Sequence, residues 1–407
     1  MEKIFDKKLL VIGPPRSGFT LLINVLTNII RYSGYRFKQT EKRSFLKNFV
    51  PLAGHFLYSE LEHFFKKYID LSKLVLSPEF KLLVGGPKWV NGDMAYIRKY
   101  IGIEDEGCFL LVFIFPKQIL DYYEVIHSHY NPIFWLNDNY YKSYLKFASI
   151  RNPLDILNSS VFSINAMTGA YIFKHNLSDI DKIREQLGLY KLTDLNVFEG
   201  LALWLKEYLK EFLKVKNNYF VMRWEDLITE PAKTIRKLAS IIGLSVSENM
   251  ALEIWDKMKY RNLTRWHVLN FRKGIIGDWK NHLTNFHIEI LKDLGYDVLC
   301  KELGYGSLYY LKVSEYTDFQ KYIEECIKKK KIYNNIEDKN IFIFGFNQTN
   351  IKTEKFGFKS FSMKDYHLYI EKTTIDNEIF FKKLLETLEP IVEKIGAYLL
   401  NKLTLLS

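Results

Sequence analysis

The chain has 407 residues, 48% of them hydrophobic and 16% aromatic, which is enough apolar material for one large or two smaller folded domains and argues against a disordered protein. Lys and Arg number 58 against 47 Asp and Glu, and the net charge of +11 favours an anionic partner unless it only reflects a lysine-rich composition. The three widely spaced cysteines, Cys108, Cys300 and Cys326, argue against a disulfide framework or a structural zinc site and fit a reducing compartment.

The N-terminus has no pattern of a signal peptide, because Met1–Lys8 is charged and leads straight into a short apolar stretch. The longest strongly apolar run, Phe109–Phe115, is far shorter than the ~20 residues that a membrane-spanning helix needs. We therefore expect a soluble cytoplasmic protein without a transmembrane segment. A peripheral contact with a membrane stays open.

The first element is a short apolar run at Lys8–Ile12 that ends in Gly13-Pro14-Pro15, which is typical of a buried strand entering a tight turn. Apolar residues then recur at helical spacing over Thr20–Ile30. A strand, a glycine- and proline-containing loop and a helix are the usual beginning of nucleotide-binding α/β folds.

The loop from Gly13 to Thr20 has the composition of an anion site. Backbone N–H groups at a helix N-terminus attract phosphate or sulfate, Ser17 and Thr20 add hydroxyl donors, and Arg16 adds a fixed positive charge. Gly13 and Gly18 have the P-loop spacing, but Phe19 stands where that motif has its lysine. The loop therefore argues against ATP or GTP hydrolysis but remains compatible with phosphate binding. A plain strand-to-helix turn is the alternative.

Further short apolar runs bounded by turn residues predict strands, with helices between them. The strands are expected at Leu82–Val84, Phe109–Phe115, Lys146–Ile150 and Tyr219–Met222, and helices at Leu201–Val215 and Ala232–Ile242, among others. This alternation predicts an α/β fold with a central parallel sheet flanked by helices.

Two segments do not fit this alternation. Asn165–Thr193 is polar, with mixed charges, and we expect a loop-and-helix insertion that could act as a lid. After Gly306 a basic helix ends in Lys328–Lys331, and a small C-terminal α+β appendage follows, with strands at Ile341–Phe346, Phe356–Phe361 and His367–Glu371 and an amphipathic helix at Asn377–Leu403. We divide the chain into residues 1–305, with the insertion at about 165–193, and an extension of unknown role at 306–407.

The segment Arg151-Asn152-Pro153-Leu154-Asp155 follows a predicted strand, so Arg151 is expected at the carboxyl edge of the sheet, where open α/β sheets bind ligands. Ser159 stands eight residues later on the following helix. An arginine and a serine in this arrangement can hold one phosphate by charge and by a hydrogen bond. A surface salt bridge at Arg151 and an ordinary helical serine are the alternative.

Two further segments offer groups that suit a nucleotide. In Arg272-Lys273-Gly274, two adjacent cations and a glycine allow the backbone to approach a doubly charged phosphate, and Trp279 could anchor this loop; a basic surface loop is the alternative. Trp224 follows a strand and could present its ring to a purine, although a core tryptophan explains it equally well.

Taken in this order along Lys8–Thr284, these segments resemble the sulfotransferase superfamily that uses 3′-phosphoadenosine 5′-phosphosulfate. The resemblance implies a P-loop NTPase-like sulfotransferase fold and a donor site. The first loop corresponds to the 5′-phosphosulfate loop, Arg151 and Ser159 to the 3′-phosphate pair, and Trp224 to a position near the adenine. The residues implied in donor binding are Pro15, Arg16, Ser17, Gly18, Phe19, Thr20, Arg151, Ser159, Trp224, Arg272, Lys273 and Gly274.

The first loop departs from many cytosolic members and is closer to the tyrosylprotein-type branch. Arg16 stands where they often have Lys, Phe19 where Thr is frequent, and Leu21 where small-molecule members often have Trp. The histidine of their Lys-Thr-His segment has no obvious counterpart. These differences argue against the phenol and steroid branch and leave donor binding intact.

The resemblance implies in-line transfer of the sulfuryl group without a metal ion, releasing 3′-phosphoadenosine 5′-phosphate. Arg16 is expected to stabilise the leaving 5′-phosphate oxygen by charge. Lys88 resembles a family lysine that contacts the transferring group, or it is a solvated loop lysine. A base should accept the acceptor's proton, and the candidates are Glu41, His55, His127 and His129.

The expected acceptor is a hydroxyl, or in second place an amine, on a glycan or a small metabolite; lipid-linked glycans and peptide tyrosine also stay open. We expect no nucleic acid partner, and the oligomeric state stays open. The alternative functions are a P-loop kinase, which the missing lysine disfavours, and a non-catalytic polyanion-binding module built on the basic tail.

Overall fold

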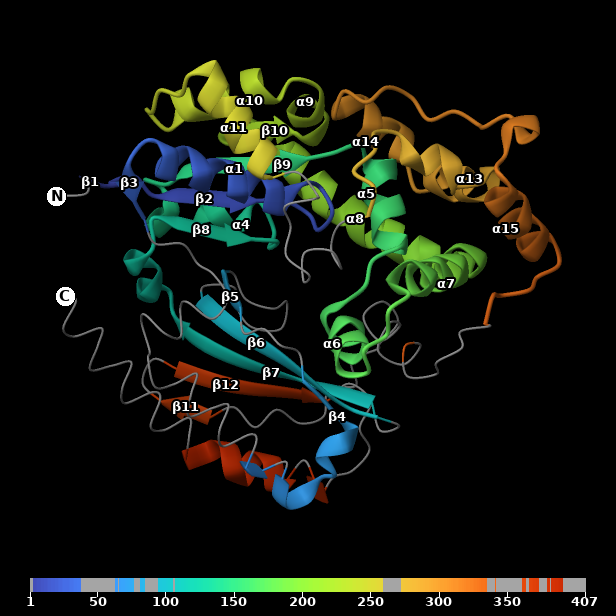
Figure 1. Cartoon of the computed structure of the whole chain (residues 1–407), viewed down its shortest axis with the longest axis horizontal. Coiled ribbons are helices and arrows are strands. Elements are labelled where there is room, and N and C mark those ends of the chain that lie inside the picture. The colour runs from blue at the N-terminus through green and yellow to red at the C-terminus, as the bar shows by residue number, and fades with distance from the viewer. Residues whose placement is uncertain are drawn as a thin grey trace. The chain divides into compact units, whose positions relative to one another are not determined.

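The computed structural model describes residues 3–37, 63–64, 66–76, 81–84, 94–104, 107–258, 272–334, 341, 361–363, 366–372, 379–380 and 382–390. The chain divides into two compact units. Unit 1 contains residues 1–38, 124–164 and 179–337, and unit 2 contains residues 39–123, 165–178 and 338–407 (Figure 1).

Unit 1 is built on a four-stranded parallel sheet in the order β10-β9-β2-β8. Its strands are β2 (Leu9–Ile12), β8 (Val125–Ser128), β9 (Leu145–Ile150) and β10 (Phe220–Arg223). Residues 9–12 pair in parallel with residues 125–128 on one side and 145–148 on the other. The predicted α/β fold with a central parallel sheet is confirmed.

Helices α1 (Phe19–Tyr32), α10 (Pro231–Ile241) and α11 (Glu248–Lys257) pack against one face of this sheet (Figure 1). The core there joins Leu9 and Val11 of β2 to Leu22 and Leu26 of α1 and to Ile235 of α10, all of them buried. Short strands β1 (Lys3–Ile4) and β3 (Tyr35–Arg36) pair in parallel. The helical α1 follows β2 after six loop residues, as the apolar spacing predicts.

The remaining elements of unit 1 connect and cover the sheet. They are the helices α4 (Phe134–Asn137), α5 (Pro153–Val161), α7 (Ile180–Thr193), α8 (Leu195–Val215), α9 (Trp224–Thr229), α13 (Asn285–Asp293), α14 (Tyr296–Glu302) and α15 (Asp318–Lys328), and the 3₁₀ turns η3 (Asn139–Tyr141), η4 (Lys216–Asn218), η6 (Asp278–Asn281) and η7 (Val313–Glu315).

Unit 2 contains a separate antiparallel sheet. Its strands are β4 (Leu74–Leu76), β5 (Lys81–Val84), β6 (Met94–Ile103), β7 (Gly107–Pro116), β11 (Phe361–Met363) and β12 (Tyr366–Lys372). Unit 2 also contains η1 (Leu71–Lys73), η2 (Lys117–Tyr122) and α6 (Ala166–Lys174). The strands predicted at 82–84 and 109–115 therefore exist but belong to this sheet, and their assignment to the parallel sheet was wrong. A short apolar run carries no information about strand direction.

The C-terminal tail joins unit 2 through β12, which pairs with β7 over residues 367–372 and 109–114. The strand predicted at His367–Glu371 is confirmed; it pairs with β11 of the tail on one side and with β7 on the other, so the tail strands extend the sheet that begins near residue 74. The described part of the last predicted helix, residues 379–380 and 382–390, is helical. The predicted boundary at residue 306 lies inside unit 1, and independent folding on either side of it stays a prediction.

The predicted polar insertion at 165–193 forms the helices α6 and α7, which fall in different units. Helix α7 is largely buried and packs against α5, α8 and α15. No helix among the described residues is long and apolar enough to cross a membrane. The three cysteines are buried and free.

Candidate functional site

The loop between β2 and α1 is held in a conformation that presents the start of α1. Gly18 has φ of 88° and Arg16 has φ of 71°, a left-handed conformation that is uncommon for a residue with a side chain. The buried Ser17 Oγ lies 2.8 Å from the Pro14 carbonyl oxygen and 3.1 Å from Ser149 Oγ. The Ser17 hydroxyl thus ties the loop to β9, whereas Thr20 is exposed at the start of α1.

Helix α1 begins without a side-chain cap and without an acidic residue in its first turn. The first N–H groups of a helix have no partner within the helix, and the helix dipole places partial positive charge there. The described loop therefore has the geometry of an anion site, as its sequence predicts.

Two histidines at the carboxyl end of β8 lie beside this loop. The Phe19 ring packs against His129 with ring centroids 4.1 Å apart, and against His127 at 5.7 Å. His129 Nδ1 lies 2.7 Å from the Gly13 carbonyl oxygen, which can only accept, so Nδ1 carries the proton and donates. In the neutral ring, Nε2 is then the nitrogen with a lone pair.

Trp224 connects the first loop to Arg151. A Cβ atom at Gly18 would lie 2.4 Å from Cδ1 of Trp224, so the indole occupies the space that a side chain would need. The Arg151 guanidinium lies over the same ring, with its Cζ atom 3.9 Å from the ring centroid. Trp224 is 5% exposed, so its ring holds Arg151 in place within the core of unit 1.

Arg151 follows the last residue of β9 and is almost completely buried. Its Nη2 atom donates to the Ile275 carbonyl oxygen at 3.1 Å, and its buried Nε makes no hydrogen bond to the described residues. Burial lowers its pKa, and the neighbouring charges of Asp155 and Glu225 oppose that shift. Glu225 also accepts from the Asn152 backbone N–H at 2.8 Å and from the Tyr305 hydroxyl at 2.9 Å, which fixes this turn.

The loop that begins at Arg272 is anchored to α5 by Asp155. The two carboxylate oxygens of this buried residue accept from the backbone N–H groups of Gly277, at 2.8 Å, and Trp279, at 3.2 Å. The sequence places Asp155 in the first turn of a helix, which is confirmed, but its contact with residues 277–279 was not predicted. Arg151 and the loop that includes Arg272 are thereby brought together.

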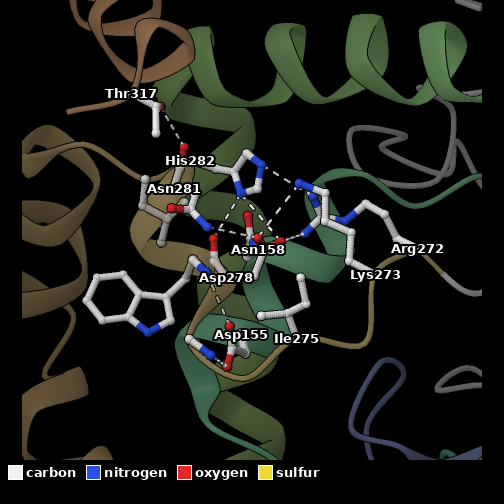
Figure 2. A network of polar contacts seen from close by, with 12 residues as sticks. Asp155, Asn158, Arg272, Lys273, Ile275, Asp278, Asn281, His282 and Thr317 are labelled. Carbon is white, nitrogen blue, oxygen red and sulfur yellow. Dashed lines mark hydrogen bonds and ion pairs between the residues drawn. The ribbon is translucent and has the colours of Figure 1, made fainter. Parts of the chain in front are cut away.

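Within this loop, Arg272 is held by a buried polar network (Figure 2). Its guanidinium forms an ion pair with Asp278 and lies over the Phe162 ring, with Cζ 4.3 Å from the centroid. His282 Nδ1 donates to the Asp278 backbone carbonyl at 3.0 Å. Lys273 lies 3.9 Å from Asp278 and is half-exposed, and Gly274 has φ of 64°.

The network is electrostatically matched. Although burial alone raises the pKa of Asp278, the hydrogen bond from Asn281 and the charge of Arg272 lower it below its usual value. Burial lowers the pKa of His282 to about 4, so its ring is neutral at pH 7. A bound phosphate would thus compete with Asp278 for Arg272, while Lys273 already faces solvent.

Sequence reasoning missed two cations of α7. Arg184 and Lys191 are 5% and 3% exposed and lie seven residues apart, on the same side of the helix. Burial and the charge of Arg184 lower the pKa of Arg16 to about 10. Burial lowers the pKa of Arg272 too, and the charge of Arg184 acts in the same direction. The only available signal was two cations placed two helical turns apart among apolar residues.

The other predicted residues are distributed as follows. Ser159 lies half-buried on α5, eight residues after Arg151, and Pro15 is half-buried in the first loop. Glu41, His55 and Lys88 lie outside the described residues. Within the described ranges no group of three or more His, Cys, Asp or Glu side chains could hold a metal ion.

Comparison with known proteins adds an independent result. Residues 121–300 match the sulfotransferase domain family. Mouse sulfotransferase 2A6 is 27% identical over 157 residues, which cover 33% of this chain and 49% of the relative, and mouse sulfotransferase 2A1 is 26% identical over 218 residues, 49% of this chain and 70% of the relative. Cytosolic sulfotransferase 11 of Arabidopsis thaliana is 32% identical over 95 residues, 19% of this chain and 27% of the relative.

The alignment with mouse 2A6 thus spans about half of that relative's length. Among solved structures, mouse sulfotransferase SULT7A1 complexed with PAP, at 15% identity, covers 78% of this chain and 88% of its own, with a TM-score of 0.38. The matched residues 121–300 include β9, Arg151, Trp224 and the loop from Arg272. Residues 121–300 of the chain thus match the sulfotransferase domain family, and the chain is similar in sequence to sulfotransferases of mouse and Arabidopsis thaliana.

Proposed function

We propose that the protein transfers a sulfuryl group from 3′-phosphoadenosine 5′-phosphosulfate to a hydroxyl acceptor. The observation that supports this most strongly is that four segments far apart in the sequence meet in one place. Gly18 of the first loop packs on Trp224, Trp224 carries Arg151, and Arg151 donates to Ile275 of the Arg272 loop. A nucleotide with phosphates at both its 5′ and 3′ positions needs two anion sites held at a fixed spacing, which this arrangement supplies.

In this proposal, the first loop and Arg16 hold the 5′-phosphosulfate. Backbone N–H groups of Phe19 and Thr20 face the anion, and Arg16 stabilises the negative charge that develops on the leaving 5′-phosphate oxygen. The Ser17 hydroxyl bonds protein atoms instead, so its contribution is to hold the loop. Lys88 remains a proposed contact of the transferring group.

The 3′-phosphate is held by Arg151 and Ser159 of the β9–α5 segment, with Arg272, Lys273 and the backbone of Gly274 closing over it. Buried guanidinium groups of this kind bind phosphate strongly because little water competes for them. The buried and unpaired Nε of Arg151 supports this role, since a phosphate oxygen would satisfy it. Trp224 orients Arg151, and the adenine is proposed to lie near Trp224, at the edge of the Arg151–Trp224 pair.

Among the proposed bases Glu41, His55, His127 and His129, the geometry favours His129. It follows β8, the strand next to β2, and its Nδ1–H bond to Gly13 orients the ring beside the first loop. The Nε2 lone pair can accept the proton of an acceptor hydroxyl as sulfur–oxygen bond formation proceeds. The proton moves to His129, the sulfuryl group to the acceptor oxygen, and 3′-phosphoadenosine 5′-phosphate leaves.

We further propose a glycan or a small metabolite as the acceptor and a cytoplasmic location. The absence of an apolar membrane-spanning helix among the described residues is compatible with both. The name of the Arabidopsis relative, a cytosolic sulfotransferase, supports the location.

The proposal is tested by thermal stabilisation with 3′-phosphoadenosine 5′-phosphate and with adenosine 5′-phosphate. A ligand at 100 times its Kd adds about 2.7 kcal/mol of stability. We expect a large shift with the bisphosphate and a small one with the monophosphate. Arg151→Ala should remove the difference, whereas Arg236→Ala, at an exposed arginine of α10, should retain it. Equal responses to both nucleotides in the wild-type protein would contradict the proposed donor.

A further inference from the structure

Strand β10 (Phe220–Arg223) leaves one edge of the parallel sheet of unit 1 open. It pairs with β9 on one side, and no described strand pairs with it on the other. Phe220 and Val221 are 44% and 41% exposed, so solvent reaches the strand. Alternate residues of an edge strand direct their N–H and C=O groups away from the sheet, where these groups can bond to another chain. The edge of β10 can therefore accept an additional strand.

A hollow of about 440 Å³ is lined by β10 and α10. Its apolar part includes Met222 of the strand and Leu238 and Ile241 of the helix. Met222 and Leu238 are buried and belong to the core of unit 1, so this lining is firmly held. The opposite charges of Lys237 and Asp226 also line the hollow and largely balance each other. We call this space the larger hollow, and it suits an apolar side chain.

A second space, of about 240 Å³, is lined by β10, α8 and the end of α14, and we call it the smaller hollow. Val221 and Arg223 line it, whereas Phe220 and Met222 line the larger hollow and not the smaller one. Successive side chains of a strand point to opposite faces of its sheet, so the two hollows lie on opposite faces of the β10 edge. A strand added to β10 would direct its side chains alternately into one hollow and the other.

Two cations at the smaller hollow form no ion pair with a carboxylate in the part of the chain that the structure describes. The Lys216 Nζ atom donates to the Glu302 backbone carbonyl at 3.3 Å. The Arg223 guanidinium donates to the Leu303 carbonyl and lies over the Tyr305 ring, with its Cζ atom 4.7 Å from the ring centroid. The carboxylate in the lining is that of Glu302, so the cations outnumber it. This face of the edge therefore suits an acidic side chain.

We propose that the β10 edge binds an extended segment of another protein in which apolar and acidic residues alternate. The backbone of this segment adds a fifth strand to the four-stranded sheet, through hydrogen bonds to the outward N–H and C=O groups of β10. Its apolar side chains enter the larger hollow, and its acidic side chains lie on the other face, near Lys216 and Arg223. The inference does not depend on the proposed sulfuryl transfer.

The charge of the chain makes a second copy a poorer occupant of this edge than an acidic segment. Each copy carries a net charge of +11, and pairing of two β10 edges would bring two sets of Lys216 and Arg223 to one interface. Like charges brought together at an interface oppose association. An acidic segment instead supplies the carboxylates that these two cations lack.

The test is hydrogen exchange of the full chain, followed by mass spectrometry, with a capped synthetic peptide of alternating valine and glutamate about eight residues long. We expect slower exchange at residues 220–223 when this peptide is added. In fluorescence anisotropy, a peptide of alternating valine and lysine should bind about tenfold or more weakly, because its cations meet Lys216 and Arg223. Two successive central prolines should abolish binding, because one of them removes an N–H that faces β10.

Lys216→Glu tests the charge of the edge from the side of the protein. It should weaken binding of the valine–glutamate peptide by about threefold to tenfold. Lys210→Glu, at an exposed lysine of α8 that lines neither hollow, is the matched control and should bind as the wild type does. Thermal unfolding checks that both variants are folded, and the comparison of peptides on the wild-type chain is independent of them.

Three results would overturn the inference. The first is unchanged exchange at residues 220–223 with the valine–glutamate peptide, and the second is equal affinity for the glutamate and lysine peptides. The third is exchange at these residues that slows as the protein concentration rises without peptide, because a second copy of the chain would then occupy the edge.

Discussion

At the residue scale, the first consequence concerns His129 as the base. Asn can retain a hydrogen bond to the Gly13 carbonyl but cannot accept a proton, so His129→Asn should lower sulfuryl turnover by about 10²–10⁴-fold while nucleotide affinity changes little. The measurement is the rate of 3′-phosphoadenosine 5′-phosphate release, with nucleotide affinity determined separately. His175→Asn, at a histidine paired with Glu104 in unit 2, is the control and should keep full turnover. Full turnover in His129→Asn would return the choice to Glu41, His55 or His127.

A second residue-scale prediction concerns stability against pH. His287 is buried, accepts from the Thr284 N–H at 3.0 Å and donates to the Leu192 carbonyl at 2.9 Å, and burial lowers its pKa to about 4. Between pH 6.5 and 4 the unfolded state binds more protons than the folded state. The free energy of unfolding should therefore decrease as the pH is lowered from 6.5 to 4, and this one residue should account for about 3 kcal/mol of the decrease.

Urea unfolding at pH 7.5 and pH 5 measures this dependence. His287→Gln should be less stable at pH 7.5 and should show a shallower loss towards pH 5, with His282 supplying what remains. His175→Gln, at a partly exposed histidine, should keep the wild-type slope. An unchanged slope in His287→Gln would show that the histidine is not neutral in the folded state.

Sequence analysis succeeded at the residue scale where a residue's neighbours along the chain determine its role. Arg16 and Gly18 shape a loop because a strand precedes them and a helix follows. It could not identify Asp155 as the anchor of residues 277–279, nor Glu225 as the bridge between Asn152 and Tyr305, because these contacts join residues 73 to 124 positions apart. The bond of Ser17 to Ser149 was hidden for the same reason.

At the element scale, α7 shows why average polarity misleads. Its sequence has mixed charge, which suggested a polar loop-and-helix insertion, yet it buries Ile183, Leu187 and Leu192 together with Arg184 and Lys191. The sequence alone does not distinguish a buried cation from an exposed one, because burial is determined by tertiary packing. The strands at 82–84 and 109–115 were misassigned for a related reason, since pairing direction is set by distant partners.

The packing of α7 on α5 gives a prediction at this scale. Gly188→Ala gains helix propensity but forces a Cβ into Phe162, so we expect a net loss of about 1–3 kcal/mol in the free energy of unfolding and weaker nucleotide binding. Gly200→Ala on α8 meets no atom within 4 Å and should stabilise by about 0.5–1 kcal/mol. Urea unfolding measures both. A neutral or stabilising Gly188→Ala would show that α7 is not fixed by this contact.

At the scale of the whole molecule, the sequence identified the parallel sheet and the sulfotransferase resemblance but not the second sheet. The strands of unit 2 come from residues 74–116 and 361–372. The pairing of β12 with β7 joins residues far apart in the sequence, so no local sequence pattern predicts it. The predicted boundary at residue 306 followed a change in composition, whereas residues 303–320 belong to unit 1, where the Tyr305 hydroxyl donates to Glu225 and the Gln320 amide donates to the Leu283 carbonyl.

Turnover of 3′-phosphoadenosine 5′-phosphosulfate with a panel of hydroxyl-bearing glycans and metabolites, in the presence of a metal chelator, tests sulfuryl transfer by this protein most directly. Release of 3′-phosphoadenosine 5′-phosphate and the sulfated acceptor are measured together by mass spectrometry. We expect stoichiometric formation of both products, inhibition by added 3′-phosphoadenosine 5′-phosphate, and loss of turnover in Arg151→Ala but not in Arg236→Ala. Nucleotide turnover that is unchanged in Arg151→Ala and is not inhibited by 3′-phosphoadenosine 5′-phosphate would contradict the proposed sulfuryl transfer. Phosphoryl transfer from ATP and Mg²⁺ by the same site would also contradict it.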